Sequence, residues 1–122
     1  MIEEISTDEV ADLLDADQRV RVVDIRSPAA YRRGHIPGSE NVPFPELTRR
    51  VEDLVGADHV VTVCPHGVDS VKAARLIDSC EGIDDDTPVV SMAGGLAKWD
   101  GELVDGVEDA GDAADGGPAA PF

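Results

Sequence analysis

The stretch 59–70 constrains the fold of this 122-residue chain more than any other part of it. Residues Val60 to Val63 are all β-branched, which is typical of a buried strand. From Val71 onward the apolar residues recur at helical spacing, and Ser70 just before them predicts a capped helix start. A strand that passes through a short loop into a helix is the basic unit of α/β proteins.

The rest of the chain alternates between the same two patterns. Short β-branched or apolar runs predict strands, and capping residues before spaced apolar residues predict helices. Further strands are predicted at 4–5, 20–25, 40–42 and 89–92. Helices are predicted to start at Ser6 and Ser27, to span 46–55 with Val55 facing inward, and to form a short turn at 96–99. This order predicts an α/β domain with a mostly parallel sheet.

Cys64 is the candidate functional residue, because it follows the predicted central strand and precedes the helix. Ligands of parallel sheets bind at the carboxyl ends of the strands, and Asp24 and Met92 close two other strands at the same edge. Backbone N–H groups and the helix dipole at such a turn favour the thiolate form of a cysteine. The alternative is that Cys64 is a small buried hydrophobic residue at a strand end.

The charge of the chain is strongly unbalanced, with 26 acidic and 10 basic residues and a net charge of -16. Such a composition resembles that of salt-adapted proteins and indicates a halophilic protein. Negative charge of this size argues against binding to nucleic acid or to an anionic membrane.

Several other features limit the function. No apolar run is long enough to span a membrane, and nothing indicates secretion, so Cys64 and Cys80 are expected to be reduced thiols in the cytoplasm. We expect no metal, because Cys64 and His66 are too close in sequence and no second ligand cluster follows. Residues 105–122 are mostly Gly, Ala, Asp and Pro, which predicts a disordered acidic tail after a domain at 1–104.

Three separate blocks of sequence carry a resemblance to the rhodanese-like domain family. The second block is the Cys64 loop, and the other two lie near the carboxyl ends of the predicted strands at 20–25 and 89–92. The first block comprises Val22-Val23-Asp24-Ile25-Arg26, Tyr31, Gly34-His35-Ile36-Pro37-Gly38-Ser39 and Asn41-Val42-Pro43, and the third comprises Met92-Ala93-Gly94-Gly95-Leu96 and Trp99. The resemblance covers about residues 4–104.

The resemblance implies a three-layer α/β domain whose central, mostly parallel sheet of about five strands is flanked by helices. It implies sulfur transfer through a persulfide on Cys64, with no cofactor. The expected partners are a small sulfur donor or a persulfide-carrying protein, together with a sulfur acceptor that the sequence does not identify. The active-site loop then comprises Pro65, His66, Gly67, Val68, Asp69 and Ser70, with Asp24 and Arg26 as structural support nearby.

Two residues depart from the pattern of the family. Ala30 replaces a glutamate that usually precedes the aromatic residue of the first block, so Arg26 is expected to have another partner. Asp69 stands where members that use thiosulfate usually carry a cation. A carboxylate at this position disfavours an anionic donor such as thiosulfate, although it does not prevent formation of a persulfide.

Two other functions remain as alternatives. The related cell-cycle phosphatases share the fold, but they need an arginine six positions after the cysteine to hold the phosphoryl oxygens. Position 70 is serine here, and the loop is one residue shorter. A non-catalytic interaction module is the second alternative, although the retained Cys64 favours an enzyme.

The net charge leads to a prediction about salt. Self-repulsion destabilises the folded chain in dilute buffer, and molar salt shortens the Debye length to about 3 Å. The melting temperature is therefore expected to rise from low to molar KCl, as followed by circular dichroism. A melting temperature that stays constant over this range would contradict the halophilic interpretation.

Overall fold

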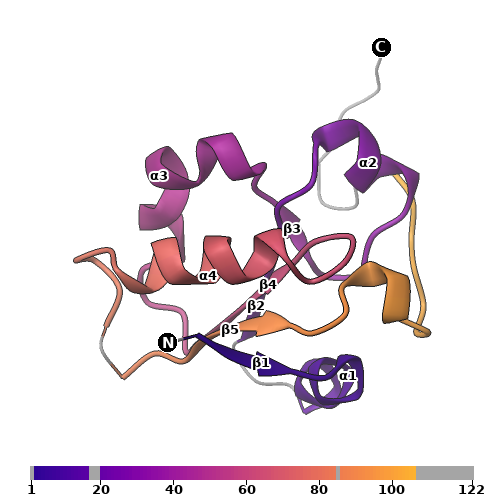
Figure 1. The fold of residues 1–122 in the computed structure, drawn as a ribbon, viewed down its shortest axis with the longest axis horizontal. Helices are drawn as coiled ribbons and strands as arrows, with labels where there is room; N and C mark the ends of the chain where they lie inside the picture. The colour runs from indigo at the N-terminus through magenta and orange to yellow at the C-terminus, as the bar shows by residue number, and fades with distance from the viewer. Residues whose placement is uncertain (1, 17–19, 85, 107–122) are drawn as a thin grey trace.

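The computed structural model describes residues 2–16, 20–84 and 86–106 of the chain. They form one sheet of five parallel strands in the order β1-β5-β4-β2-β3, which confirms the predicted fold class (Figure 1). The strands are β1 Glu3–Ile5, β2 Val20–Asp24, β3 Glu40–Asn41, β4 His59–Val63 and β5 Val89–Met92. The central strand β4 is the one that leads to Cys64.

Helices connect the strands, as parallel pairing requires. They are α1 Thr7–Asp15, α2 Pro28–Arg33, α3 Leu47–Arg50 and α4 Asp69–Asp78, with short 3-10 turns at Phe44–Glu46, Val51–Leu54 and Leu96–Lys98. The predicted capping box at Ser6 and Glu9 begins α1. In the described part of the chain, no helix combines the length and the apolar character that crossing a membrane requires.

The sheet separates two apolar layers, because successive side chains of a strand point to opposite faces. Val23 and Val60 belong to the layer that contains residues of α3 and α4. Val22 and Val61, their neighbours in sequence, belong to the layer that contains Val10 of α1. Strands buried on both faces explain why the β2 and β4 segments are continuous β-branched runs.

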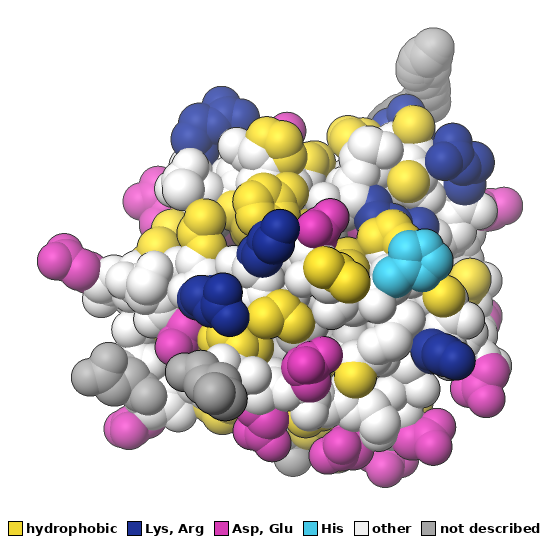
Figure 2. Space-filling model, viewed as in Figure 1, with side chains coloured by type: hydrophobic (Ala, Val, Ile, Leu, Met, Phe, Trp, Pro, Cys, Tyr) yellow, Lys and Arg dark blue, Asp and Glu magenta, His cyan; other side chains and the backbone are white. Residues whose placement is uncertain are grey.

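The two sides of the molecule differ in charge. The view in Figure 2 shows Lys and Arg side chains over α2, α3 and α4. The basic residues of these helices are Arg32, Arg33, Arg49, Arg50, Lys72 and Arg75. Along the lower edge, over α1 and β1, acidic side chains predominate. Residues 1–16 include six acidic residues and no Lys or Arg.

Two local predictions were wrong. Ser70 does not cap α4, which begins one residue earlier at Asp69 without a side-chain cap, because Ser70 is fully buried and its N–H group faces the cysteine sulfur. The segment 46–55 is not one helix, since 3-10 turns flank α3. Val55 adopts an extended conformation after the last turn and is 51% exposed, so it does not face the core.

The predicted tail at 105–122 lies outside the described residues from position 107 onward. At its start, the Gly106 N–H group donates a hydrogen bond to the Arg32 carbonyl at 2.8 Å. Val104 exchanges two backbone hydrogen bonds of 2.8 Å with His35. The disordered tail remains a prediction.

Candidate active site

Cys64 lies immediately after β4, which pairs with β2 on one side and β5 on the other. Its side chain is 2% exposed and belongs to the apolar layer on the side of α4. Thr62, two residues earlier on the same face, donates a hydrogen bond from Oγ1 to the Ser70 carbonyl at 2.6 Å. This bond holds the first turn of α4 against the strand that carries the cysteine.

The sulfur of Cys64 is surrounded by polar groups from the loop that follows it. The N–H groups of Gly67 and Ser70 donate to Sγ at 3.0 and 3.3 Å. The Cys64 thiol donates to the Ser70 hydroxyl oxygen at 3.3 Å. Because the Ser70 N–H belongs to the first turn of α4, one of the donors that a helix leaves unpaired is used on the sulfur. This arrangement suits a sulfur that carries negative charge.

Ser91 also belongs to the site, although the sequence patterns did not point to it. Its hydroxyl lies 2.7 Å from that of Ser70, and both residues are fully buried. The pair extends the hydrogen bonds of the sulfur from the loop to β5. A serine inside the otherwise apolar run Val89–Met92 was the available signal, because a buried hydroxyl must find a partner.

The loop is held in place by the backbone that follows β5. Leu96 and Ala97 donate their N–H groups to the carbonyls of Cys64 and Pro65, each at 2.9 Å. Gly95 lies where the two segments meet and has a φ of +65°. A Cβ atom there would fall 2.5 Å from the His66 nitrogen. Only glycine allows the two segments to approach so closely.

Asp24 and Arg26 form a tight pair at the end of β2. Arg26 donates to the two Asp24 carboxylate oxygens at 2.8–3.2 Å and to the Gly34 carbonyl at 2.7 Å. Asp24 is 1% exposed. Arg26 therefore has other partners than the glutamate that Ala30 replaces, and the pair braces the loop after β2.

A shallow pocket of about 320 Å³ opens beside the cysteine. Among its lining residues, Arg26 carries positive charge but is engaged by Asp24, whereas Asp69 brings an exposed carboxylate. The complete lining is Ile25, Arg26, Ser27, Ala30, Phe44, Cys64, Pro65 and Asp69. The pocket can admit a small group to the sulfur, next to a negative charge at its entrance.

The predicted loop residues therefore separate into two groups. Gly67 and Ser70 are buried and bond to the sulfur. The other four, Pro65, His66, Val68 and Asp69, have exposed side chains, and the described contacts include no hydrogen bond from them to Sγ. Val68 is 64% exposed, which is high for an apolar residue. These four residues form the outer surface that an incoming molecule would meet.

Comparison with known proteins identifies the family. The family model of the rhodanese-like domain matches residues 6–102. The chain belongs to the rhodanese-like domain family. This confirms the resemblance carried by the three sequence blocks.

Individual relatives agree with this assignment. The chain is 34% identical over 104 residues to the thiosulfate sulfurtransferase GlpE of Pseudoalteromonas translucida, covering 85% of this chain and 94% of the relative. It is 29% identical to the putative sulfur carrier protein YrkF of Bacillus subtilis, covering 83% of this chain but only 52% of that protein.

Solved structures give the same result. A thiosulfate sulfurtransferase from Pseudomonas aeruginosa superposes with a TM-score of 0.75 at 27% identity, covering 87% of this chain and 20% of that one. A rhodanese-like domain protein from Staphylococcus aureus gives a TM-score of 0.71 at 25% identity, covering 86% of this chain and all of that one. The match thus spans the whole of the second structure but only a fifth of the first.

The contact at Gly95 leads to a prediction about stability. Gly95→Ala should lower the free energy of unfolding by at least ~2 kcal/mol more than Gly38→Ala, as measured by urea titration. Gly38 is the matched control, since its φ is also positive at +85° but a Cβ atom there meets nothing within 4 Å. Equal losses for the two variants would mean that backbone strain alone, and not the close approach, makes glycine necessary at position 95.

Proposed function

We propose that this rhodanese-like domain is a sulfurtransferase that carries a sulfane sulfur as a persulfide on Cys64. The observation that supports this most directly is the set of polar groups around Sγ, which accepts from the N–H groups of Gly67 and Ser70 and lies 3.3 Å from the Ser70 hydroxyl, to which the thiol donates. Relatives named as sulfurtransferases support the same activity.

The reaction proceeds in two displacement steps. The Cys64 thiolate attacks the outer sulfur of a donor, either a persulfide R–S–S⁻ or thiosulfate. A bond forms between Sγ and that sulfur while the S–S bond of the donor breaks, and the leaving thiolate or sulfite takes the bonding electrons. An acceptor thiolate then attacks the terminal sulfur, which regenerates the Cys64 thiolate.

The loop contributes mainly electrostatic stabilisation to these steps. The Gly67 and Ser70 N–H groups are already oriented before the reaction, so they stabilise anionic sulfur at little reorganisation cost. The Ser70 hydroxyl accepts a hydrogen bond from the thiol and can donate one to the thiolate, with Ser91 as its second partner. The chemistry in this mechanism requires no group beyond the protein and its sulfur substrates.

The pocket entrance favours one class of donor over another. Asp69 lines the pocket, and its carboxylate repels the two negative charges of thiosulfate. A persulfide on a partner protein brings less charge into the pocket. We propose a protein persulfide as the preferred donor, and the Lys and Arg residues over α2, α3 and α4 would attract a partner with an acidic surface (Figure 2).

A non-catalytic interaction module remains the alternative function. The exposed outer loop, with Val68 at 64% exposure, would serve such a module equally well. The alternatives differ in whether Cys64 accepts sulfur. The pocket disfavours a phosphatase, which needs a guanidinium to hold the phosphoryl oxygens. Arg26 lines the pocket, but its guanidinium is bound to Asp24.

The nucleophile can be tested by mass spectrometry. After incubation with a persulfide donor, intact wild-type protein is expected to gain the mass of one sulfur atom, and Cys64→Ser is expected to gain none. Cys80→Ser is the matched control, because Cys80 is also a free thiol but lies just after α4, where it donates to the Leu76 carbonyl at 3.3 Å. An adduct that depends on Cys80, or no adduct on wild type, would refute the proposal.

The role of Asp69 can be tested by charge reversal. Asp69→Arg should raise the second-order rate with thiosulfate by about tenfold, most strongly at low salt, because repulsion becomes attraction. Asp69→Asn should give a smaller gain. Asp78→Arg is the control, since it makes the same charge change at the other end of α4. If Asp78→Arg accelerates the reaction as much, net charge rather than the pocket entrance controls the rate.

A further inference from the structure

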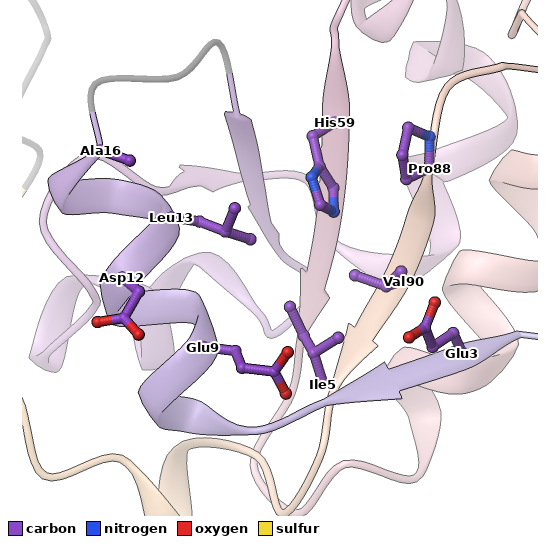
Figure 3. Close-up of a pocket in the computed structure, with 9 residues that line it drawn as sticks. All are labelled: Glu3, Ile5, Glu9, Asp12, Leu13, Ala16, His59, Pro88 and Val90. Carbon is purple, nitrogen blue, oxygen red and sulfur yellow. The ribbon is translucent and has the colours of Figure 1, made fainter.

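A second cavity lies on the other side of the sheet from the cysteine loop, between α1 and the amino-terminal ends of β1, β4 and β5. Its volume is about 540 Å³, within the usual range of small-molecule sites. Figure 3 shows the side chains of Leu13 and His59 directed into the space between α1 and the sheet. The cavity, called here the α1 cavity, is lined by Glu3, Ile5, Glu9, Asp12, Leu13, Ala16, His59, Pro88 and Val90.

The described residues that line the α1 cavity carry only negative charge, apart from the neutral imidazole of His59. Glu3 comes from β1, whereas Glu9 and Asp12 come from α1, so the carboxylates approach from two separate elements. Among the residues that the structure describes, the lining contains no Lys or Arg. Between the carboxylates, Ile5, Leu13 and Val90 form an apolar floor.

His59 adds an unpaired polar atom to the α1 cavity. Its Nε2 atom is buried and, among the described residues, has no hydrogen-bond partner. A buried nitrogen without a partner is costly, so a turn of the partly exposed ring that brings Nε2 to a donor in the cavity would be favoured. Burial lowers the pKa of the imidazole below its usual value, although the negative charge of Glu3 opposes this shift. The neutral ring can therefore accept a hydrogen bond at Nε2.

These features select the chemistry of a ligand. Separate carboxylates around an apolar floor suit a chain that alternates ammonium groups with methylene groups. No group of three or more His, Cys, Asp or Glu residues in the described part of the chain is arranged to hold a metal ion. We propose that the α1 cavity binds a linear aliphatic polyamine, with its ammonium groups near Glu3 and the α1 carboxylates and its methylene groups over Ile5, Leu13 and Val90.

The chain offers a control of identical composition. Glu3 and Ile5 line the α1 cavity, whereas Glu4, between them on β1, points to the opposite face. On α1, Asp12 lines the cavity and Asp15 does not. The double variants Glu3→Gln/Asp12→Asn and Glu4→Gln/Asp15→Asn therefore have the same net charge and differ only in where charge is removed.

The experiment titrates each protein with spermidine at constant ionic strength by isothermal calorimetry, after circular dichroism has shown that each variant is folded. Wild type is expected to show saturable binding of one equivalent. The Glu3→Gln/Asp12→Asn variant should bind about five- to tenfold more weakly, and the Glu4→Gln/Asp15→Asn variant less than about twofold more weakly.

Proton NMR of the histidine rings locates the binding. On saturation, the His59 resonances of wild type should shift, whereas those of His66 in the cysteine loop should not. Magnesium at matched ionic strength should leave His59 unchanged. Equal weakening in the two double variants, absence of saturation, or a shift at His66 but not at His59 would overturn the proposal, since each would mean that spermidine binds the acidic surface in general or does not bind.

Discussion

The environment of the Cys64 sulfur depends on the close approach of two backbone segments, the cysteine loop and the turn after β5. Two N–H groups of that turn bond to the carbonyls of Cys64 and Pro65, and Gly95 lies against the loop without a side chain. With its carbonyls engaged, the loop is free to direct N–H groups toward Sγ. The geometry of the sulfur site is therefore set by a segment some thirty residues later in the chain.

A second layer of contacts fixes the start of α4 relative to β4. The hydroxyl of Thr62 holds the Ser70 carbonyl, while the N–H and hydroxyl groups of Ser70 face Cys64 and Ser91. In the interior of a sheet these polar groups need partners, and they find them in one another. The same contacts explain why Ser70 is unavailable as a helix cap.

The unequal distribution of charge gives the two sides of the sheet different characters. On the side of the candidate active site, helices α2, α3 and α4 carry Lys and Arg residues, although Asp69 lines the pocket itself. The side with α1 is acidic and contains a cavity with an unpaired imidazole nitrogen. A net charge of -16 thus does not describe what an approaching molecule meets on either side.

The sequence alone predicted the α/β class, the parallel strands, the start of α1 and the place of Cys64 at a strand end. These depend on local signals, namely β-branched runs, capping residues and the order of elements, and short-range physics is enough to interpret them. Tertiary structure decided what surrounds the sulfur. The pairing of Ser70 with Ser91 and the contact at Gly95 join segments through sheet order, which spacing along the chain does not encode. Local periodicity likewise could not show that Val55 is exposed, because the helical segment ends just before it, or that His59 borders a cavity, because this depends on how α1 covers the sheet.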